Sequence, residues 1–257
     1  MNARPVLLLR GLLFWALFAP SVVFYATLAI LMLPLPYLWR YRVVGTWAAL
    51  VLWWLRVTCG IRHEVRGREN IPEGPAIVMS KHQSTWETIA LQRIFPPQVW
   101  VLKKELLYVP FFGWALMALE GIAIDRGAGR RAVVELVRQG QQRLDTGRWV
   151  VIFPEGTRTR PCQRPRYKIG GAVLAAKTGY PVVPVAHNAA EHWPKKPVIK
   201  YPGTIRVSIG PVIETRGRKA EEILAEVEAW IEGEMPHVLE HPCPQEAPEA
   251  TASVEAQ

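Results

Sequence analysis

The N-terminal region limits most strongly what this chain can fold into. Residues 11–38 contain no charged side chain, and this run is longer than the roughly 20 apolar residues that a helix needs to span a bilayer. Pro20, Pro34 and Pro36 interrupt the run and predict kinks or a break. A second uncharged run, residues 43–55, is short and contains three tryptophans, which is typical of a segment at the level of lipid headgroups.

We therefore expect residues 1–59 to be helical and to anchor the protein in a membrane. A signal peptide is one alternative, but the run is too long for its apolar core and lacks a clear small-x-small cleavage site. A buried helix of a soluble protein is the other. Basic residues flank the first run on both sides, so the positive-inside rule leaves its orientation open. These residues are Arg4, Arg10, Arg40 and Arg42.

Charge is distributed unevenly along the chain. The formal net charge is +9, and the last 27 residues hold six glutamates and no lysine or arginine. Because those residues contribute −6, residues 1–230 carry +15. Such a body favours an anionic partner such as a lipid headgroup or a phosphorylated substrate, although plain solubility is an alternative. The basic residues are dispersed and form no nucleic-acid-binding motif, so we expect no nucleic acid partner. Residues 239–257 are predicted to form a disordered acidic tail.

The three cysteines, Cys59, Cys162 and Cys243, are far apart and form no C-x-x-C pair. This pattern argues against a disulfide framework and against a cysteine-based metal site. We predict reduced thiols, as in a domain that faces the cytoplasm.

Residues 60–238 alternate short apolar runs with helix-like stretches, which predicts one α/β domain. The expected strands are 75–79, 99–102, 122–124, 149–153, 182–186 and 204–209, and the expected helices are 86–94, 130–144 and 219–231.

A first polar cluster, residues 81–87, follows the first of these strands. His82 and Glu87 would point about 140° apart in one continuous helix, but they can meet if His82 lies in the preceding turn. The carboxylate would then fix the imidazole tautomer and leave the other ring nitrogen free to take a proton. The alternative is that Ser84 and Glu87 form a capping box and His82 is an ordinary loop residue.

A second cluster, residues 153–160, follows the strand at 149–153. Gly156 allows backbone amides to approach an anion closely, and the planar fork of Arg158 can grip a phosphate through two hydrogen bonds. Arg160, Arg164, Arg166 and Lys168 add positive charge nearby. The alternative is a solvated strand-to-helix loop.

Two weaker signals complete the set. Arg126 follows the short strand 122–124, where the alternative is a surface ion pair with Asp125. Pro184 lies inside the apolar strand 182–186, and there the simplest interpretation is core packing, with His187 as a packed histidine.

In this order, the four clusters resemble those of the glycerophosphate acyltransferase family over residues 62–210. The resemblance implies a mixed α/β sheet flanked by helices, with N-terminal membrane-associated helices. It implies that His82 is the catalytic base, paired with Glu87, and that Pro184 affects donor binding or site shape. The implied substrate-binding residues are Arg126, Glu155, Gly156, Thr157 and Arg158, and possible supporting residues are Ser84, Lys104 and Lys168.

Two positions depart from the family pattern. The family usually has aspartate where this chain has Glu87, and the extra methylene moves the carboxylate by roughly 1.5 Å. Ala123 replaces a residue that is often aromatic.

The resemblance implies an enzyme of the inner membrane whose catalytic domain faces the cytoplasm. It would transfer an acyl chain from acyl-CoA or acyl carrier protein (acyl-ACP) to the sn-2 hydroxyl of 1-acyl-sn-glycerol 3-phosphate, without a metal or cofactor. Alternatives are another acceptor (glycerol 3-phosphate, a lysophospholipid or a lyso-ornithine lipid), a lipid hydrolase, or a non-catalytic scaffold. The chain has no Gly-x-Ser-x-Gly elbow, which argues against a serine hydrolase.

Overall fold

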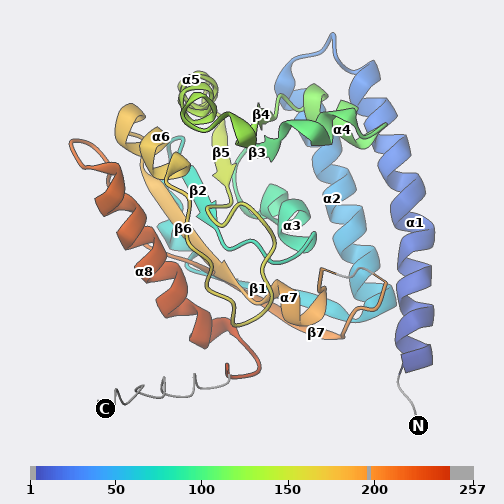
Figure 1. Cartoon of the computed structure of the whole chain (residues 1–257). Coiled ribbons are helices and arrows are strands. Elements are labelled where there is room, and N and C mark those ends of the chain that lie inside the picture. The colour runs from blue at the N-terminus through green and yellow to red at the C-terminus, as the bar shows by residue number, and fades with distance from the viewer. Residues whose placement is uncertain (1–3, 196–197, 244–257) are drawn as a thin grey trace, which may run out of the picture.

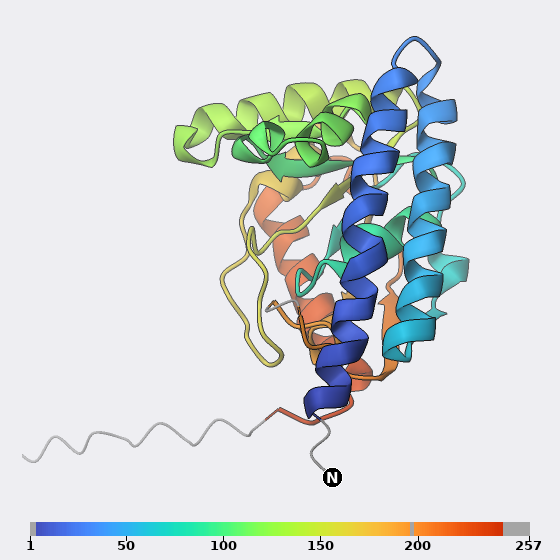
Figure 2. The same cartoon turned by 90° about the vertical axis from the view of Figure 1, so that its right-hand side faces the viewer.

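The N-terminal region forms a hairpin of two long helices, α1 (Arg4–Leu31) and α2 (Tyr37–Cys59), in a computed structural model that describes residues 4–195 and 198–243 (Figures 1 and 2). Among these residues, α1 is the one helix long and apolar enough to cross a membrane, and 17% of its most apolar window is buried. The indole of Trp47 donates to Ser21 Oγ (3.1 Å) and that of Trp54 donates to the Leu13 carbonyl (3.2 Å). Two of the three tryptophans predicted for the headgroup level therefore hold the hairpin together.

The prolines of the apolar run have two different effects. α1 continues through Pro20, and it ends at Leu31 before the turn that contains Pro34 and Pro36. Pro36 then caps the start of α2. The predicted break is therefore confirmed only at the second and third prolines.

The rest of the chain folds around one seven-stranded sheet of order β1-β7-β6-β2-β5-β3-β4. Its strands are β1 (Ile61–Arg66), β2 (Ile77–Ser80), β3 (Gln98–Lys103), β4 (Ile122–Ile124), β5 (Trp149–Ile152), β6 (Val182–His187) and β7 (Gly203–Ile209). Neighbouring strands are parallel except for β6 and β7, which pair antiparallel. The predicted mixed α/β sheet is confirmed.

Helices cover both faces of this sheet (Figure 1). α5 (Arg130–Asp145), α6 (Gly170–Thr178) and α8 (Ala220–Val238) pack together on one face, and α3 (Trp86–Ile94) packs against α2 on the other. The remaining helices are α4 (Phe112–Ala118), which contacts α1, the short α7 (Ala189–His192), and the 3-10 helices η1 (Arg68–Asn70), η2 (Lys104–Tyr108) and η3 (Arg126–Ala128). α1 stands at the outer edge, farthest from α8 (Figures 1 and 2).

The topology brings three of the motifs to one edge of the sheet. β2, β5, β3 and β4 are consecutive parallel strands, so their carboxyl ends lie side by side. His82 follows β2, the loop 153–160 follows β5, and Arg126 follows β4. In open α/β sheets, this edge is where ligands bind.

The prediction of reduced thiols is wrong for two of the three cysteines and confirmed for Cys59. Cys162 and Cys243 form a disulfide across 81 residues, with their Cα atoms 5.4 Å apart, and Cys59 is a buried free thiol. Sequence spacing does not reveal this pair because the fold alone brings the loop after residue 160 to the chain that leaves α8. The cysteines therefore do not support a cytoplasm-facing domain.

The predicted disordered tail also begins too early. Leu239 is buried, and the backbone amides of Glu240 and His241 donate to the Glu191 carboxylate at 2.9 and 3.0 Å. Residues 239–243 therefore belong to the folded domain. Residues 244–257 lie outside the described residues.

Candidate active site

The structure brings His82 and Glu87 together. His82 lies between β2 and α3, Glu87 lies in the first turn of α3, and Nδ1 of the imidazole is 2.8 Å from Oε1 of the carboxylate. The His82 side chain is 17% exposed, whereas that of Glu87 is fully buried. Burial alone would raise the pKa of Glu87, but the hydrogen bond from His82, the electrostatic effect of the neighbouring His187 and His82, and the Ser84 amide more than offset it and hold the pKa below its usual value.

The protonation pattern of this pair follows from Glu87 being ionised. A carboxylate only accepts hydrogen bonds, so Nδ1 of His82 carries the hydrogen. Nε2 is then the ring nitrogen with the free lone pair. The pair is arranged as a general base whose proton-accepting nitrogen is set by a buried acid.

The capping alternative holds at the same time. Glu87 accepts hydrogen bonds from the backbone amides of Gln83 and Ser84 at 2.8 Å, and Ser84 Oγ accepts one from the Trp86 amide at 3.1 Å. Ser84 Oγ also donates to the Trp193 carbonyl at 2.6 Å. One glutamate thus caps α3 and orients the imidazole, so the two interpretations are not exclusive.

The loop after β5 contacts His82 on the ring and on the main chain. Phe153 stacks on the imidazole, with ring centroids 4.1 Å apart and an interplanar angle of 14°. The Thr159 amide donates to the His82 carbonyl at 2.8 Å, and the His82 amide donates to Glu155 Oε2 at 2.6 Å. The sequence did not identify Phe153 as a site residue, although it begins the motif.

Glu155, which the family resemblance assigns to substrate binding, is buried and paired within the protein. It is 3% exposed, and its other carboxylate oxygen lies 2.9 Å from Lys81 Nζ, beneath the site. Burial raises the pKa of Glu155 above its usual value, although Lys81 opposes the rise. Both of its oxygens are used by the protein itself.

Cationic groups gather beside this loop. The Arg126 guanidinium donates to the Gly156 carbonyl, which joins the second and third motifs. Lys168 packs over Gly156, where a Cβ would lie 2.8 Å from Nζ, and Gly156 has the positive φ of 70° that glycine tolerates. Thr157 is exposed and Arg158 is half-buried.

The next two arginines in the chain have different surroundings from Arg158. Arg164 pairs with Glu228, and Arg160 is exposed. Among the described residues, the Arg158 side chain has no hydrogen bond or ion pair, so its donors remain available to an anion.

A cavity of about 210 Å³ opens beside these cations. Arg126, Gly156 and Lys168 contribute its polar part. The apolar part is contributed by Val101, Ile124, Ala132, Val133, Leu136, Ile152, Phe153, Pro154 and Ile169. A more open hollow of about 410 Å³ lies elsewhere, between α2, β1 and β7, and none of the motif residues lines it. His82 and Arg158 do not line the smaller cavity themselves, but Phe153, which stacks on His82, does, so this cavity adjoins the site.

The remaining predicted residues have other roles. Pro184 is buried in β6, beside Gly210. His187 is buried, which lowers its pKa, and its Nε2 donates to the Lys81 carbonyl at 2.8 Å. Lys104 is exposed at the start of η2, and within residues 4–195 and 198–243 no hydrogen bond or ion pair joins it to the other predicted residues. No group of His, Cys, Asp or Glu in the same residues has an arrangement suited to a metal ion.

Known proteins are similar to this chain in sequence and in fold. Residues 62–188 match the family described as Acyltransferase. The 1-acyl-sn-glycerol-3-phosphate acyltransferase of Pseudomonas aeruginosa is 48% identical over 235 residues, which is 90% of this chain and 91% of that protein. The enzyme of the same name from Saccharomyces cerevisiae is 35% identical over 135 residues, 51% of this chain and 44% of its own length.

A solved structure agrees at the level of the fold. The 1-acyl-sn-glycerophosphate acyltransferase of Thermotoga maritima superposes with a TM-score of 0.76 at 24% identity, covering 92% of this chain and 98% of that one. Together with the geometry of the His82 site, the near full-length match to the Pseudomonas enzyme shows that this chain belongs to the 1-acyl-sn-glycerol-3-phosphate acyltransferase family.

Proposed function

We propose that this protein transfers an acyl chain to the sn-2 hydroxyl of 1-acyl-sn-glycerol 3-phosphate (lysophosphatidic acid) and so makes phosphatidic acid. One observation carries the proposal: a His82–Glu87 pair at 2.8 Å lies against the loop after β5, and the half-buried Arg158 of that loop has no side-chain hydrogen bond or ion pair within residues 4–195 and 198–243. The matching relatives carry the name of this activity.

The chemistry follows from the tautomer of His82. Nε2 takes the proton of the sn-2 hydroxyl while that oxygen attacks the carbonyl carbon of an acyl thioester. The tetrahedral intermediate collapses, the carbon–sulfur bond breaks, and the imidazolium returns the proton to the departing thiolate. Glu87 stabilises the imidazolium between the two steps, which is the role of the acid in a Ser-His-Asp triad. The substrate hydroxyl takes the place of the serine.

The phosphate of the acceptor would be held at the cationic side of the site. Arg158 offers a planar pair of donors, and Arg126 and Lys168 add charge at the mouth of the cavity. Burial lowers the pKa of Arg126, and the Glu105 carboxylate opposes this, but a guanidinium stays charged at any working pH. The apolar walls of the cavity suit an acyl chain.

The donor in this proposal is acyl-CoA or acyl-ACP, and no metal or other cofactor takes part. Both carriers present the acyl group as a thioester, which supplies the leaving thiolate that the mechanism needs. The basic body of the chain suits either carrier, because both are anionic.

We place the protein at the inner membrane, with the domain facing the cytoplasm, where thioester donors are found. The exposed apolar surface of α1 and the α1–α2 hairpin would hold the site at the bilayer that contains both lipid substrate and product. Protease accessibility in right-side-out and inverted vesicles tests the orientation. Cleavage of the domain only in inverted vesicles is expected, and cleavage only in right-side-out vesicles would contradict it.

The function is tested by a transfer assay with purified full-length protein in detergent. Lysophosphatidic acid is compared with glycerol 3-phosphate, a lysophospholipid and a lyso-ornithine lipid, each with acyl-CoA and acyl-ACP. Phosphatidic acid is the expected main product. A clear preference for another acceptor would reassign the substrate, and release of free fatty acid without transfer would favour a hydrolase.

A further inference from the structure

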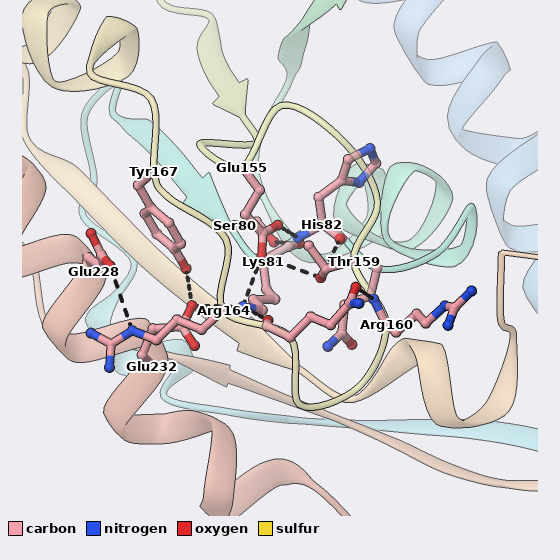
Figure 3. Close-up of polar contacts among 12 residues, drawn as sticks. Ser80, Lys81, His82, Glu155, Thr159, Arg160, Arg164, Tyr167, Glu228 and Glu232 are labelled. Atoms are coloured by element: carbon pink, nitrogen blue, oxygen red, sulfur yellow. Dashed lines mark hydrogen bonds and ion pairs between the residues drawn. The ribbon is translucent and has the colours of Figure 1, made fainter. Parts of the chain in front are cut away.

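A cluster of buried charges lies directly beneath His82 (Figure 3). Lys81 Nζ is 2.9 Å from Glu155 Oε1 and 2.7 Å from Glu232 Oε1, and it donates to the Gln163 carbonyl at 3.3 Å. The side chains of Lys81, Glu155 and Glu232 are 1%, 0% and 10% exposed. Tyr167 donates to Glu232 Oε1 at 2.8 Å.

Such a cluster is a poor means of gaining stability. Desolvating two carboxylates and an ammonium costs much of what their attraction returns, and apolar residues of similar volume often do as well. Lys81 directly precedes the base in the chain, and none of Lys81, Glu155 and Glu232 lines the cavity. The arrangement of the cluster therefore calls for an explanation other than stability or substrate binding.

The contacts of the cluster lead to His82 by two routes. Glu155 uses Oε1 for Lys81 and Oε2 for the His82 amide, 2.6 Å away. Lys81 is the residue before His82, and its own main chain is fixed at both ends, by donation to Val185 O (2.9 Å) and acceptance from His187 Nε2 (2.8 Å). The backbone that carries the imidazole is thus held on both sides.

We propose that Lys81, Glu155 and Glu232 are positioning residues that fix the backbone of His82, and that Glu155 acts on the base and not on the substrate. This inference rests on the proposed role of His82 in acyl transfer. It also gives α8 a part in the site, since Glu232 lies outside the segment 62–188 that matches the family.

A neighbouring glutamate on the same helix provides a matched control. Glu228 lies one turn before Glu232, and its ion pair with Arg164 spans 3.7 Å between side chains that are 30% and 62% exposed (Figure 3). Exposed pairs of this kind contribute little. Glu228→Gln therefore removes the same charge from the same helix without touching the cluster.

The kinetic test uses full-length protein with lysophosphatidic acid and acyl-CoA. Glu232→Gln is expected to lower kcat by roughly 10-fold and to leave KM for lysophosphatidic acid within about twofold, because the site is displaced but no substrate contact is lost. Glu155→Gln should also lower kcat without raising KM. The double variant should cost less than the product of the two single effects, because both residues act through Lys81.

A second readout reports on His82 whether or not the activity is as proposed. In protein labelled with ¹⁵N-histidine, the ring resonances of His82 (assigned by their absence in His82→Gln) report its tautomer and hydrogen bonding. Glu232→Gln should shift them, and Glu228→Gln should not. If Glu232→Gln does not fold, Tyr167→Phe keeps all charges, removes one hydrogen bond to Glu232, and should lower kcat about two- to fivefold with a smaller shift of the same resonances.

Three results would overturn the inference. The first is that kcat and the His82 resonances of Glu232→Gln equal those of Glu228→Gln. The second applies if Glu232→Gln does not fold, and is that Tyr167→Phe has the kcat and the His82 resonances of wild type. The third is that Glu155→Gln mainly raises KM for lysophosphatidic acid. Failure of wild type and Glu228→Gln to acylate lysophosphatidic acid would instead contradict the proposed function. The resonances would still decide the positioning role.

Discussion

The two halves of the site are built in opposite ways. On the base side, His82 is stacked by Phe153, paired with the fully buried Glu87, and fixed through its main chain. On the phosphate side, Thr157 and Arg126 are exposed, and Arg158 is half-buried without a protein hydrogen bond or ion pair among the described residues. The groups on the base side are already paired with one another before substrate binds. On the phosphate side, the Arg158 guanidinium has donors that no described protein group uses.

The difference matches what each half has to do. A general base must present one ring nitrogen at a fixed place, so its tautomer and angle are set by groups that exclude water. A phosphate site gains most when its donors are not already paired, because pairing them would have to be undone on binding. Changes on the base side should therefore lower kcat, and changes on the phosphate side should raise KM.

The largest effect is expected from His82→Ala. Loss of the proton acceptor should lower kcat/KM for acyl transfer by about 10³-fold, within the range that general-base catalysis contributes. Steady-state assays of detergent-purified protein measure this, with the exposed His237→Ala as the control. A loss of only a few-fold, in a variant with a wild-type circular dichroism spectrum, would remove His82 from the mechanism.

Glu87→Gln comes next. The amide still accepts hydrogen bonds through its oxygen but carries no charge to stabilise the imidazolium, so kcat should fall by about 10²-fold. KM for lysophosphatidic acid should stay near the wild-type value, because Glu87 is buried and does not line the cavity. A change confined to KM would mean that the base side also binds substrate.

Arg158→Ala should weaken binding on the phosphate side of the site. Loss of charge-assisted hydrogen bonds worth about 2 kcal/mol corresponds to a rise of roughly 30-fold in KM for lysophosphatidic acid. A neutral monoacylglycerol acceptor should be affected far less, and the exposed Arg160→Ala serves as the control. Equal losses on both acceptors would refute the assignment of Arg158 to the phosphate.

Much of the fold could be predicted because its periodic segments are strongly patterned. The helix at 86–94 and the strand at 122–124 have the predicted bounds, and the amphipathic helix at 130–144 differs by one residue. β1 and α6 were not predicted. β1 is an edge strand with four charged or polar positions in six (IRHEVR), and α6 begins with two glycines, which are poor helix formers.

The motifs of the site could be predicted from the sequence, but the contacts between motif residues and residues outside the motifs could not. Parallel strand order places the residues after β2, β4 and β5 together, and the motifs mark those positions in the sequence. The partners that lie outside the motifs leave no local signal. Glu232 lies on a helix with several glutamates that look alike in sequence although only some are exposed. Cys162 and Cys243 are far apart in the chain and are brought together by the fold.

The smallest expected effect concerns stability in acid and again separates the halves. The pKa of Glu87 is lower in the folded protein than its ordinary value of 4.5, so the folded state binds fewer protons than the unfolded state in that range. Its contribution to stability is complete above about pH 4.5 and is lost as the pH falls through the folded pKa. The difference in unfolding midpoint between wild type and Glu87→Gln should therefore be widest near neutral pH and narrow below 4.5, whereas Arg158→Ala should follow wild type throughout. If this difference in unfolding midpoint stays constant below pH 4.5, Glu87 stabilises the fold by packing alone, and the orientation of His82 does not depend on the charge of Glu87.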